Sequence, residues 1–158
     1  ELRRVMEPRT ASVAKRLETV EKLSEAGIPV HVMIAPIIPG LNDHEILKII
    51  EAVGKRGALA VGHTVVRLNG SIDKLFIDWL EKNFPDRKEK VLNQIASCHQ
   101  GRLNDNRFKK RMKGEGKFAE IIKEQMQLGR SRFLEGRKMP KLRTDLYQKQ
   151  AHTQMSLF

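Results

Sequence analysis

The stretch VHVMIAPIIPGLND, residues 30–43, decides the fold of this chain. Its first nine residues are almost continuously apolar, which is typical of a parallel strand that is buried on both faces. Pro39 and Gly40 then force a turn, and Asn42 with Glu45 forms a capping box for a following helix. Ligands of parallel α/β proteins lie beyond the carboxyl ends of the strands, so we expect this turn to face a ligand. The alternative is an ordinary strand-to-helix turn.

The elements on either side of this strand predict one strand–helix–strand unit. A helix is expected to precede it, beginning near Ser12 and ending at Gly27, and a second strand is expected over residues 59–68. The two strands begin about thirty residues apart, which suits a parallel pair joined by a right-handed helical crossover. Val13, Leu17, Val20 and Leu23 fall on one face of the first helix, and Ile46, Ile49, Ile50 and Val53 form the buried stripe expected of the connecting helix.

The rest of the chain is predicted to be mainly helical. Apolar stripes predict helices over residues 71–85, 87–100 and 117–135, the second capped by Asp86 and Glu89. The stripe residues are Ile72, Leu75, Phe76, Trp79 and Leu80 in the first of these helices and Phe118, Ile121, Ile122 and Met126 in the last.

These elements divide the chain into three parts. We expect an α/β part over residues 1–70, a helical extension over residues 71–136 and a flexible tail over residues 137–158. Two parallel strands do not form a stable sheet alone, so partner strands come from outside this chain or the unit lies against the helices that follow. Because the chain begins with Glu1 rather than Met, we expect a fragment of a longer protein.

Composition excludes several classes of protein. The single cysteine, Cys98, rules out a disulfide framework and a cysteine-only metal site, and the five histidines show no metal-ligand spacing. We therefore expect no resident metal site, and we interpret His63 as a core or surface histidine. Cys98 and His99 lie on a predicted helix with no orienting acid, so we reject them as a catalytic pair. The chain shows no membrane-spanning run and no secretory signal, and we expect a reducing, cytoplasmic location.

Positive charge is concentrated in one region. Residues 101–150 contain 15 Lys or Arg against 6 Asp or Glu, whereas residues 1–100 contain 15 against 13. The densest cluster surrounds Phe108 and comprises Arg107, Lys109, Lys110, Arg111, Lys113 and Lys117. Such a cluster neutralises several phosphates while the aromatic ring stacks on a base, so we expect salt-sensitive binding of DNA or RNA. The alternative is a solvated basic surface beside the α/β part.

Several motifs together resemble a known family. The stretch EPRTASVAKRLETVEKLSEAGIPVHVMIAPIIPGLND resembles a segment of bacterial radical S-adenosylmethionine (SAM) proteins related to spore photoproduct lyase. The resemblance continues through VVRLNG, WLEKNFPDRKEKVL and NRFKKRMKGEG, and covers most of residues 5–125. In that family a Gly-x-Ile-x-Gly-x-x-Glu pattern after the fifth strand contacts the SAM adenine. Here PIIPGLND places Ile38, Gly40 and Asp43 at the Ile, second Gly and acidic positions, while Pro36 replaces the first Gly.

The resemblance implies a fold and a chemistry. The two strands would be the fifth and sixth of a partial (β/α) barrel, which makes this chain the C-terminal portion of an α/β enzyme. Arg9 and Arg67 would lie at the barrel mouth and pair with the SAM carboxylate or a substrate phosphate, with a structural salt bridge as the alternative. In the whole enzyme, a 4Fe–4S cluster on a CxxxCxxC loop would reduce SAM to a 5′-deoxyadenosyl radical that abstracts hydrogen from substrate. This chain lacks that loop and is expected to be inactive alone.

A second resemblance lies in the tail. The peptide QMSLF, residues 154–158, resembles the motif by which bacterial replication and repair proteins bind the sliding clamp. Gln154 would form hydrogen bonds, while Leu157 and Phe158 would fill an apolar pocket. The alternative is that these apolar residues pack back onto the chain.

These observations favour one function and leave two alternatives. The leading hypothesis is the C-terminal part of a radical SAM iron–sulfur enzyme that acts on nucleic acid, as in lyase-type DNA repair. One alternative is a non-catalytic, basic nucleic-acid-binding module tethered to a sliding clamp or another partner. The other is a radical SAM enzyme with a peptide or metabolite substrate, which would leave the basic cluster without a role.

Overall fold

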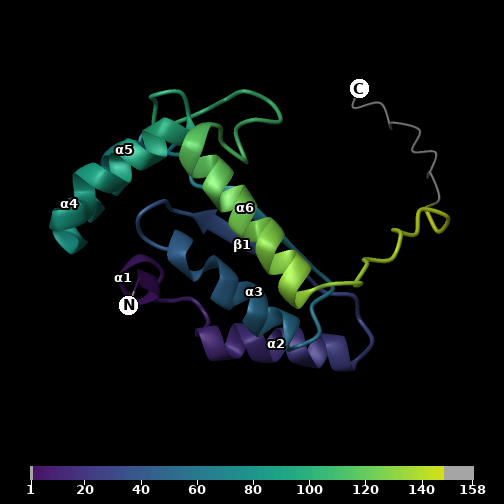
Figure 1. The fold of residues 1–158 in the computed structure, drawn as a ribbon. Helices are drawn as coiled ribbons and strands as arrows, with labels where there is room; N and C mark the ends of the chain where they lie inside the picture. The colour runs from purple at the N-terminus through teal and green to yellow at the C-terminus, as the bar shows by residue number, and fades with distance from the viewer. Residues whose placement is uncertain (1, 148–158) are drawn as a thin grey trace, which may run out of the picture.

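The computed structural model describes residues 2–147, in which six α-helices and two strands form a mixed α/β arrangement (Figure 1). Two short 3-10 turns, Asp43–Glu45 and Pro85–Arg87, precede α3 and α5. In chain order the elements are α1 (Leu2–Met6), α2 (Val13–Glu25), β1 (His31–Ile37), α3 (Ile46–Gly54), β2 (Ala60–Val65), α4 (Ile72–Asn83), α5 (Lys88–Cys98) and α6 (Gly116–Phe133).

The predicted strand–helix–strand unit is confirmed. β1 and β2 are parallel neighbours, paired from His31 with Ala60 to Ile34 with His63, and α3 connects them. The register shifts between Ile34 and Ile37, at the carboxyl end of β1. The helix before β1 is also confirmed, because Ser12 caps α2 by accepting a 3.2 Å hydrogen bond from the backbone N–H of Lys15.

One layer of helices covers the sheet. α3 and α6 lie side by side and contribute to a single core with the buried residues of both strands (Figure 1). The buried core residues of the strands are Ile34, Ile37, Val61 and Val65, those of α3 are Ile46, Ile50 and Val53, and those of α6 are Ala119, Ile122 and Met126. Although α6 lies far along the sequence, it therefore shares the core of the α/β part.

The prediction that β1 is buried on both faces is wrong. Ile34 and Ile37 are buried, but His31 is exposed and Met33 is 52% exposed. Gly62 of β2 lies on the same face, since a Cβ there would stand 2.5 Å from the Met33 sulfur. The reason is that, within residues 2–147, helices cover only one face of the sheet and no strand pairs with the outer edge of β1.

A second core lies beyond the carboxyl ends of the strands. It joins the turn after β1 and the segment after β2 to helices α4 and α5, which extend away from the sheet in Figure 1. Its buried members are Ile38, Leu41, Val66, Leu68, Phe76, Leu80, Val91 and Ile95. Helices α4 and α5 therefore pack against the end of the sheet where ligands of parallel α/β proteins bind.

Three local predictions need correction. Ile72 and Leu75 of α4 are exposed, Leu75 by 68%, because only the Phe76 and Leu80 side of that helix meets the second core. Ile121 of α6 is likewise exposed, since α6 turns its Ala119, Ile122 and Met126 side to the sheet. α5 begins without a side-chain cap because Asp86 lies inside the preceding 3-10 turn.

Candidate functional site at the carboxyl ends of the strands

The turn after β1 is braced by its own side chains. Asn42 Oδ1 accepts a 2.7 Å hydrogen bond from the Ile38 N–H, and Asn42 Nδ2 donates to the Pro36 carbonyl at 3.1 Å. Asp43 Oδ1 accepts from the Gly40 N–H at 3.0 Å. The predicted capping box is therefore wrong, because a 3-10 turn separates Asn42 from α3 and the Asn42 amide is engaged within the turn.

Gly40 is required by both backbone conformation and packing. Its φ of +81° lies in the left-handed region, and a Cβ there would stand 2.7 Å from Gln94 Oε1 and 3.3 Å from Val91 Cγ2. Side chains of α5 therefore lie close against this turn, and a Cβ at residue 40 would require the end of the Gln94 side chain to shift.

The predicted SAM-binding residues of this turn have packing or bracing roles. Ile38 is only 1% exposed and belongs to the second core, so its side chain is covered by the rest of the chain. The exposed surface here is formed by Ala35 and Pro36, at the end of β1. A SAM contact by Ile38, Gly40 or Asp43 stays a prediction.

The two predicted arginines lie in different surroundings. Arg67, just after β2, donates a 3.2 Å hydrogen bond from Nη1 to the Asp105 carbonyl and so ties the strand end to a distant loop. Arg9 is exposed in the connection between α1 and α2 and makes no hydrogen bond within residues 2–147. The structure therefore brings Arg67, but not Arg9, to the basic cluster.

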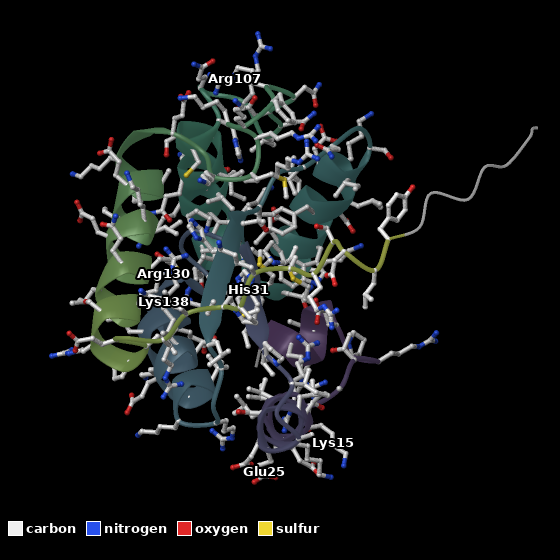
Figure 2. The ribbon with its side chains drawn as sticks, turned by 90° about the vertical axis from the view of Figure 1, so that its right-hand side faces the viewer. Lys15, Glu25, His31, Arg107, Arg130 and Lys138 are labelled. Carbon is white, nitrogen blue, oxygen red and sulfur yellow. The ribbon has the colours of Figure 1, made fainter. Side chains whose placement is uncertain are left out.

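The predicted basic cluster forms a segment along the carboxyl end of β2, here called the basic loop (residues 106–117), whose last two residues begin α6. The Val65 N–H donates to the Met112 carbonyl at 2.9 Å, and the Leu68 N–H donates to the Leu103 carbonyl, just before the loop, at 2.8 Å. In Figure 2, Arg107 lies at the opposite end of the molecule from Lys15 and Glu25 of α2. The basic loop thus borders the same sheet end as the turn after β1.

The six cations of the basic loop divide into two groups. Arg107 pairs with Asp105 at 2.7 Å and with Glu115 at 2.8 Å, and Lys110 also pairs with Glu115. The other four, which have no acidic partner within the described part of the chain, are Lys109, Arg111, Lys113 and Lys117. Two cations therefore hold the loop together by ion pairs, and the positive charge of the other four is not neutralised within the described part of the chain.

Asp105 is the anchor of this loop, and the sequence analysis did not identify it. Its carboxylate accepts hydrogen bonds from the backbone N–H and the guanidinium of Arg107, which lower the pKa of Asp105 to about 2. Hydrogen bonding to Asp105 and Glu115 raises the pKa of Arg107 in turn. Buried His99 lies beside Asp105, with Nδ1 3.8 Å from Oδ2, and its Nε2 is 2.8 Å from the Val66 carbonyl.

A cavity and a groove flank this end of the sheet. The cavity, of about 550 Å³, lies under the start of the basic loop and is lined by residues that include Leu68, His99, Asn104 and Arg107. The groove, of about 480 Å³, runs along the outer side of β1 between α1, α2 and α3, and its lining is mostly apolar.

The iron–sulfur cluster of the resembled family does not fit the described residues. Within residues 2–147, no group of three or more His, Cys, Asp or Glu side chains is placed to hold a metal. Cys98 is fully buried in the first core, and burial raises the pKa of its thiol. This chain therefore offers the cluster no set of thiolates.

His63 lies half-buried on β2 and bears no predicted catalytic role. Burial and the nearby charges of Arg130 and Lys113 lower its pKa. Arg130 of α6 itself donates two hydrogen bonds to the Val61 carbonyl, at 2.8 and 3.2 Å. The interpretation of His63 as a core or surface histidine stays a prediction.

Comparison with known proteins supports a relationship for the first third of the chain. Residues 1–53 match the family model of the Radical SAM superfamily. This match includes α1, α2, β1, the braced turn and most of α3. A radical SAM relationship is thereby supported, whereas spore photoproduct lyase-like specificity rests on the sequence resemblance alone.

Relatives extend the similarity without adding a function. An uncharacterized protein of Mycobacterium tuberculosis is 33% identical over 91 residues, which are 54% of this chain and 26% of that protein. An uncharacterized protein of Methanocaldococcus jannaschii is 30% identical over 95 residues, which are 60% of this chain and 35% of that protein. The matched region thus spans about a quarter to a third of the length of these relatives. No solved structure matches the chain significantly.

Two further predictions concern the tail and the membrane. Gln154, Leu157 and Phe158 lie outside the described residues, so the clamp-binding peptide stays a prediction. Among the helices of residues 2–147, none combines the length and the apolar character needed to span a bilayer.

Proposed function

We propose that this chain is the C-terminal portion of a radical SAM enzyme that acts on nucleic acid, with lyase-type repair of damaged DNA as its role. The observation that carries the proposal is the position of the basic loop. The loop is hydrogen-bonded to the carboxyl end of β2 through Val65 and Met112, beside the turn that follows β1. Parallel α/β enzymes bind their substrates at that end of the sheet, so a polyanion on the loop would lie next to the reaction site.

The open surfaces of the sheet support a larger barrel. The outer edge of β1 has no strand partner within residues 2–147, and the adjoining face carries exposed His31 and Met33. The mostly apolar groove of about 480 Å³ lies beside the same strand. Further strands of a (β/α) barrel would pair with this edge and cover this face, which otherwise would invite association between sheets.

In such an enzyme the residues of this chain would position ligands. The bound 4Fe–4S cluster and SAM supply radical chemistry in this superfamily, and the cluster thiolates would come from another part of the protein. Ala35 and Pro36 would form an apolar wall at the barrel mouth, and the braced turn would hold that wall in place. Arg67 would fix the basic loop against β2 through the Asp105 carbonyl.

The test uses the full-length protein after anaerobic cluster reconstitution. We expect reductive cleavage of SAM to 5′-deoxyadenosine, and DNA binding that falls at least about tenfold when Lys109, Arg111 and Lys113 are all changed to Glu. The matched control changes Lys90, Lys123 and Lys138 to Glu; these three are exposed and form no ion pair within the described residues. A protein that binds no cluster would favour the non-catalytic module, and equal loss in both triple variants would remove the argument from the basic loop.

A tethering partner completes the proposal. If QMSLF binds a sliding clamp, the enzyme would be delivered to replicating or repairing DNA, where damaged bases occur. The same peptide would serve the non-catalytic alternative equally well, so it identifies a location rather than a reaction.

A further inference from the structure

Phe108 is an aromatic side chain displayed at the surface of the basic loop. Its side chain is 78% exposed, and the nearby Met112 of the same loop is 44% exposed. A phenylalanine held in solvent loses the free energy that burial would provide, so its position has no explanation in the packing of the fold.

The loop holds Phe108 in a defined position. The Arg107 N–H donates to Asp105 Oδ1 at 2.8 Å on one side, and the Arg111 N–H donates to the Arg107 carbonyl at 2.9 Å on the other. Lys109, next to Phe108, has a left-handed φ of +69°, which is costly for a residue with a Cβ. The ring is therefore carried by a braced, locally strained turn rather than by an unstructured segment.

Positive charge surrounds the exposed ring. The Arg111 guanidinium lies 6.0 Å from the centroid of the Phe108 ring, within the range of a cation–π contact. Lys109 and Lys113 are exposed, and neither has an acidic partner in the described part of the chain. One cation thus lies over the ring, two further cations without an acidic partner belong to the same loop, and the ring itself is mostly exposed.

We propose that Phe108 stacks on an unpaired base of a nucleic acid while Lys109, Arg111 and Lys113 contact the flanking phosphates. This inference rests on the proposed nucleic-acid function and specifies the form of the ligand. A base inside a duplex is already stacked on both faces, whereas an unpaired base offers a free face to an aromatic ring. The loop therefore favours single strands, or duplexes with a displaced base, over regular duplexes.

The composition of the loop argues against a membrane surface as the ligand. Stable membrane binding needs a broad apolar face in addition to positive charge. The basic loop exposes Phe108 and part of Met112, whereas Lys109, Lys113 and Lys117 are exposed cations. One exposed aromatic ring near several cations is better suited to contact one base and its flanking phosphates than to enter a lipid bilayer.

The experiment compares the affinity of the full-length protein for a labelled single-stranded oligonucleotide and for a hairpin duplex, by fluorescence anisotropy. We expect Phe108→Ala to weaken single-strand binding about tenfold and duplex binding less than twofold. Phe108→Trp should retain single-strand binding, and its fluorescence should be quenched on binding.

The control is Leu75→Ala, which removes an exposed apolar side chain from α4 and should change neither affinity. Lys109→Gln should lower the slope of log affinity against log salt by about 0.7 on the single strand.

Three outcomes would overturn the proposal, and they remain distinguishable. If Phe108→Ala weakens both ligands equally or neither, stacking is wrong while nucleic-acid binding stands. If the wild-type protein binds neither oligonucleotide, the proposed nucleic-acid function fails and the stacking inference fails with it. Binding to anionic phosphatidylserine vesicles that Phe108→Ala abolishes, without any oligonucleotide binding, would assign the loop to a membrane instead.

Discussion

The side chain of Asn42 reaches back across the turn after β1, and its Oδ1 accepts a 2.7 Å hydrogen bond from the backbone N–H of Ile38. Its Nδ2 at the same time donates to the Pro36 carbonyl. One amide therefore satisfies two backbone groups in a turn that has few other partners for them. This turn lies at the sheet end that borders the basic loop. The two Asn42 hydrogen bonds therefore brace the turn beside that loop.

Replacing Asn42 by Ala should destabilise the protein by about 1–2 kcal/mol, because two backbone groups lose their partner. Urea unfolding followed by circular dichroism measures this change. Gln127→Ala, an exposed site on α6, is the control and should change stability by less than about 0.5 kcal/mol. An Asn42→Ala protein as stable as the control would show that water replaces the amide at no cost.

Gly40→Ala should be more damaging than the same change at Gly101. Both glycines have nearly the same φ, +81° and +80°, but a Cβ at Gly101 meets nothing within 4 Å. Gly101→Ala should therefore show only the backbone cost, about 1–2 kcal/mol, and Gly40→Ala should add about 1–3 kcal/mol from the clash with Gln94. Equal losses in urea unfolding would contradict the close approach of α5.

The clash can be separated from the backbone cost in the same series. Adding Gln94→Ala to Gly40→Ala removes the nearest atom of the clash and should recover part of the loss, while the backbone cost remains. No recovery in the double variant would indicate that Val91, rather than Gln94, limits the space.

Local signals predicted the elements well where the partner residue was close in sequence. Helix α2 was predicted from its apolar spacing and from Ser12 as its N-cap. In the structure the Ser12 side chain accepts the Lys15 N–H, three residues away in the sequence. The parallel pairing of β1 and β2 followed from the length of the connection. At Asn42, by contrast, the amide had two local uses, a helix cap or a turn brace, and in the structure it serves the second, with a 3-10 turn between it and α3.

Predictions failed where the answer depended on distant contacts. The apolar stripe of α4 could not indicate that only its Phe76 and Leu80 side meets another element. The cluster of cations was visible in the sequence, but its division was not, because it depends on how the loop brings Asp105 and Glu115 to Arg107. The exposed face of β1 was missed for a related reason, since an apolar strand looks the same whether or not its cover is present.

Acid should loosen the basic loop through Asp105. Its pKa of about 2 in the folded protein lies below the ordinary aspartate value of about 3.9, chiefly because of the hydrogen bonds from Arg107. A lowered folded-state pKa means that this stabilisation is complete above about pH 4 and is lost as the pH falls toward about 2. Thermal unfolding between about pH 5 and pH 2 should therefore show a smaller pH dependence for Asp105→Asn than for the wild type.

The control for this titration is Asp78→Asn, an exposed site on α4 that pairs with Lys82. It should leave the acid profile of the wild type largely unchanged, because exposed pairs contribute little. If both variants follow the wild-type profile, the pairing of Asp105 with Arg107 does not govern acid stability.

The peptide of residues 149–158, carrying a fluorescent label, should bind purified bacterial sliding clamp saturably, as measured by fluorescence polarisation. Leu157 and Phe158 would provide the apolar anchors and Gln154 the hydrogen bonds, so a peptide with Leu157→Ala and Phe158→Ala should lose binding. A further peptide with Ser156→Ala should bind almost as well, because that position carries neither an anchor nor the glutamine amide. Binding lost only in the double-alanine peptide would place the protein at sites of DNA synthesis or repair. Equal weak binding by all three peptides would reduce the motif to a chance resemblance and would leave the basic loop as the sole argument for nucleic acid.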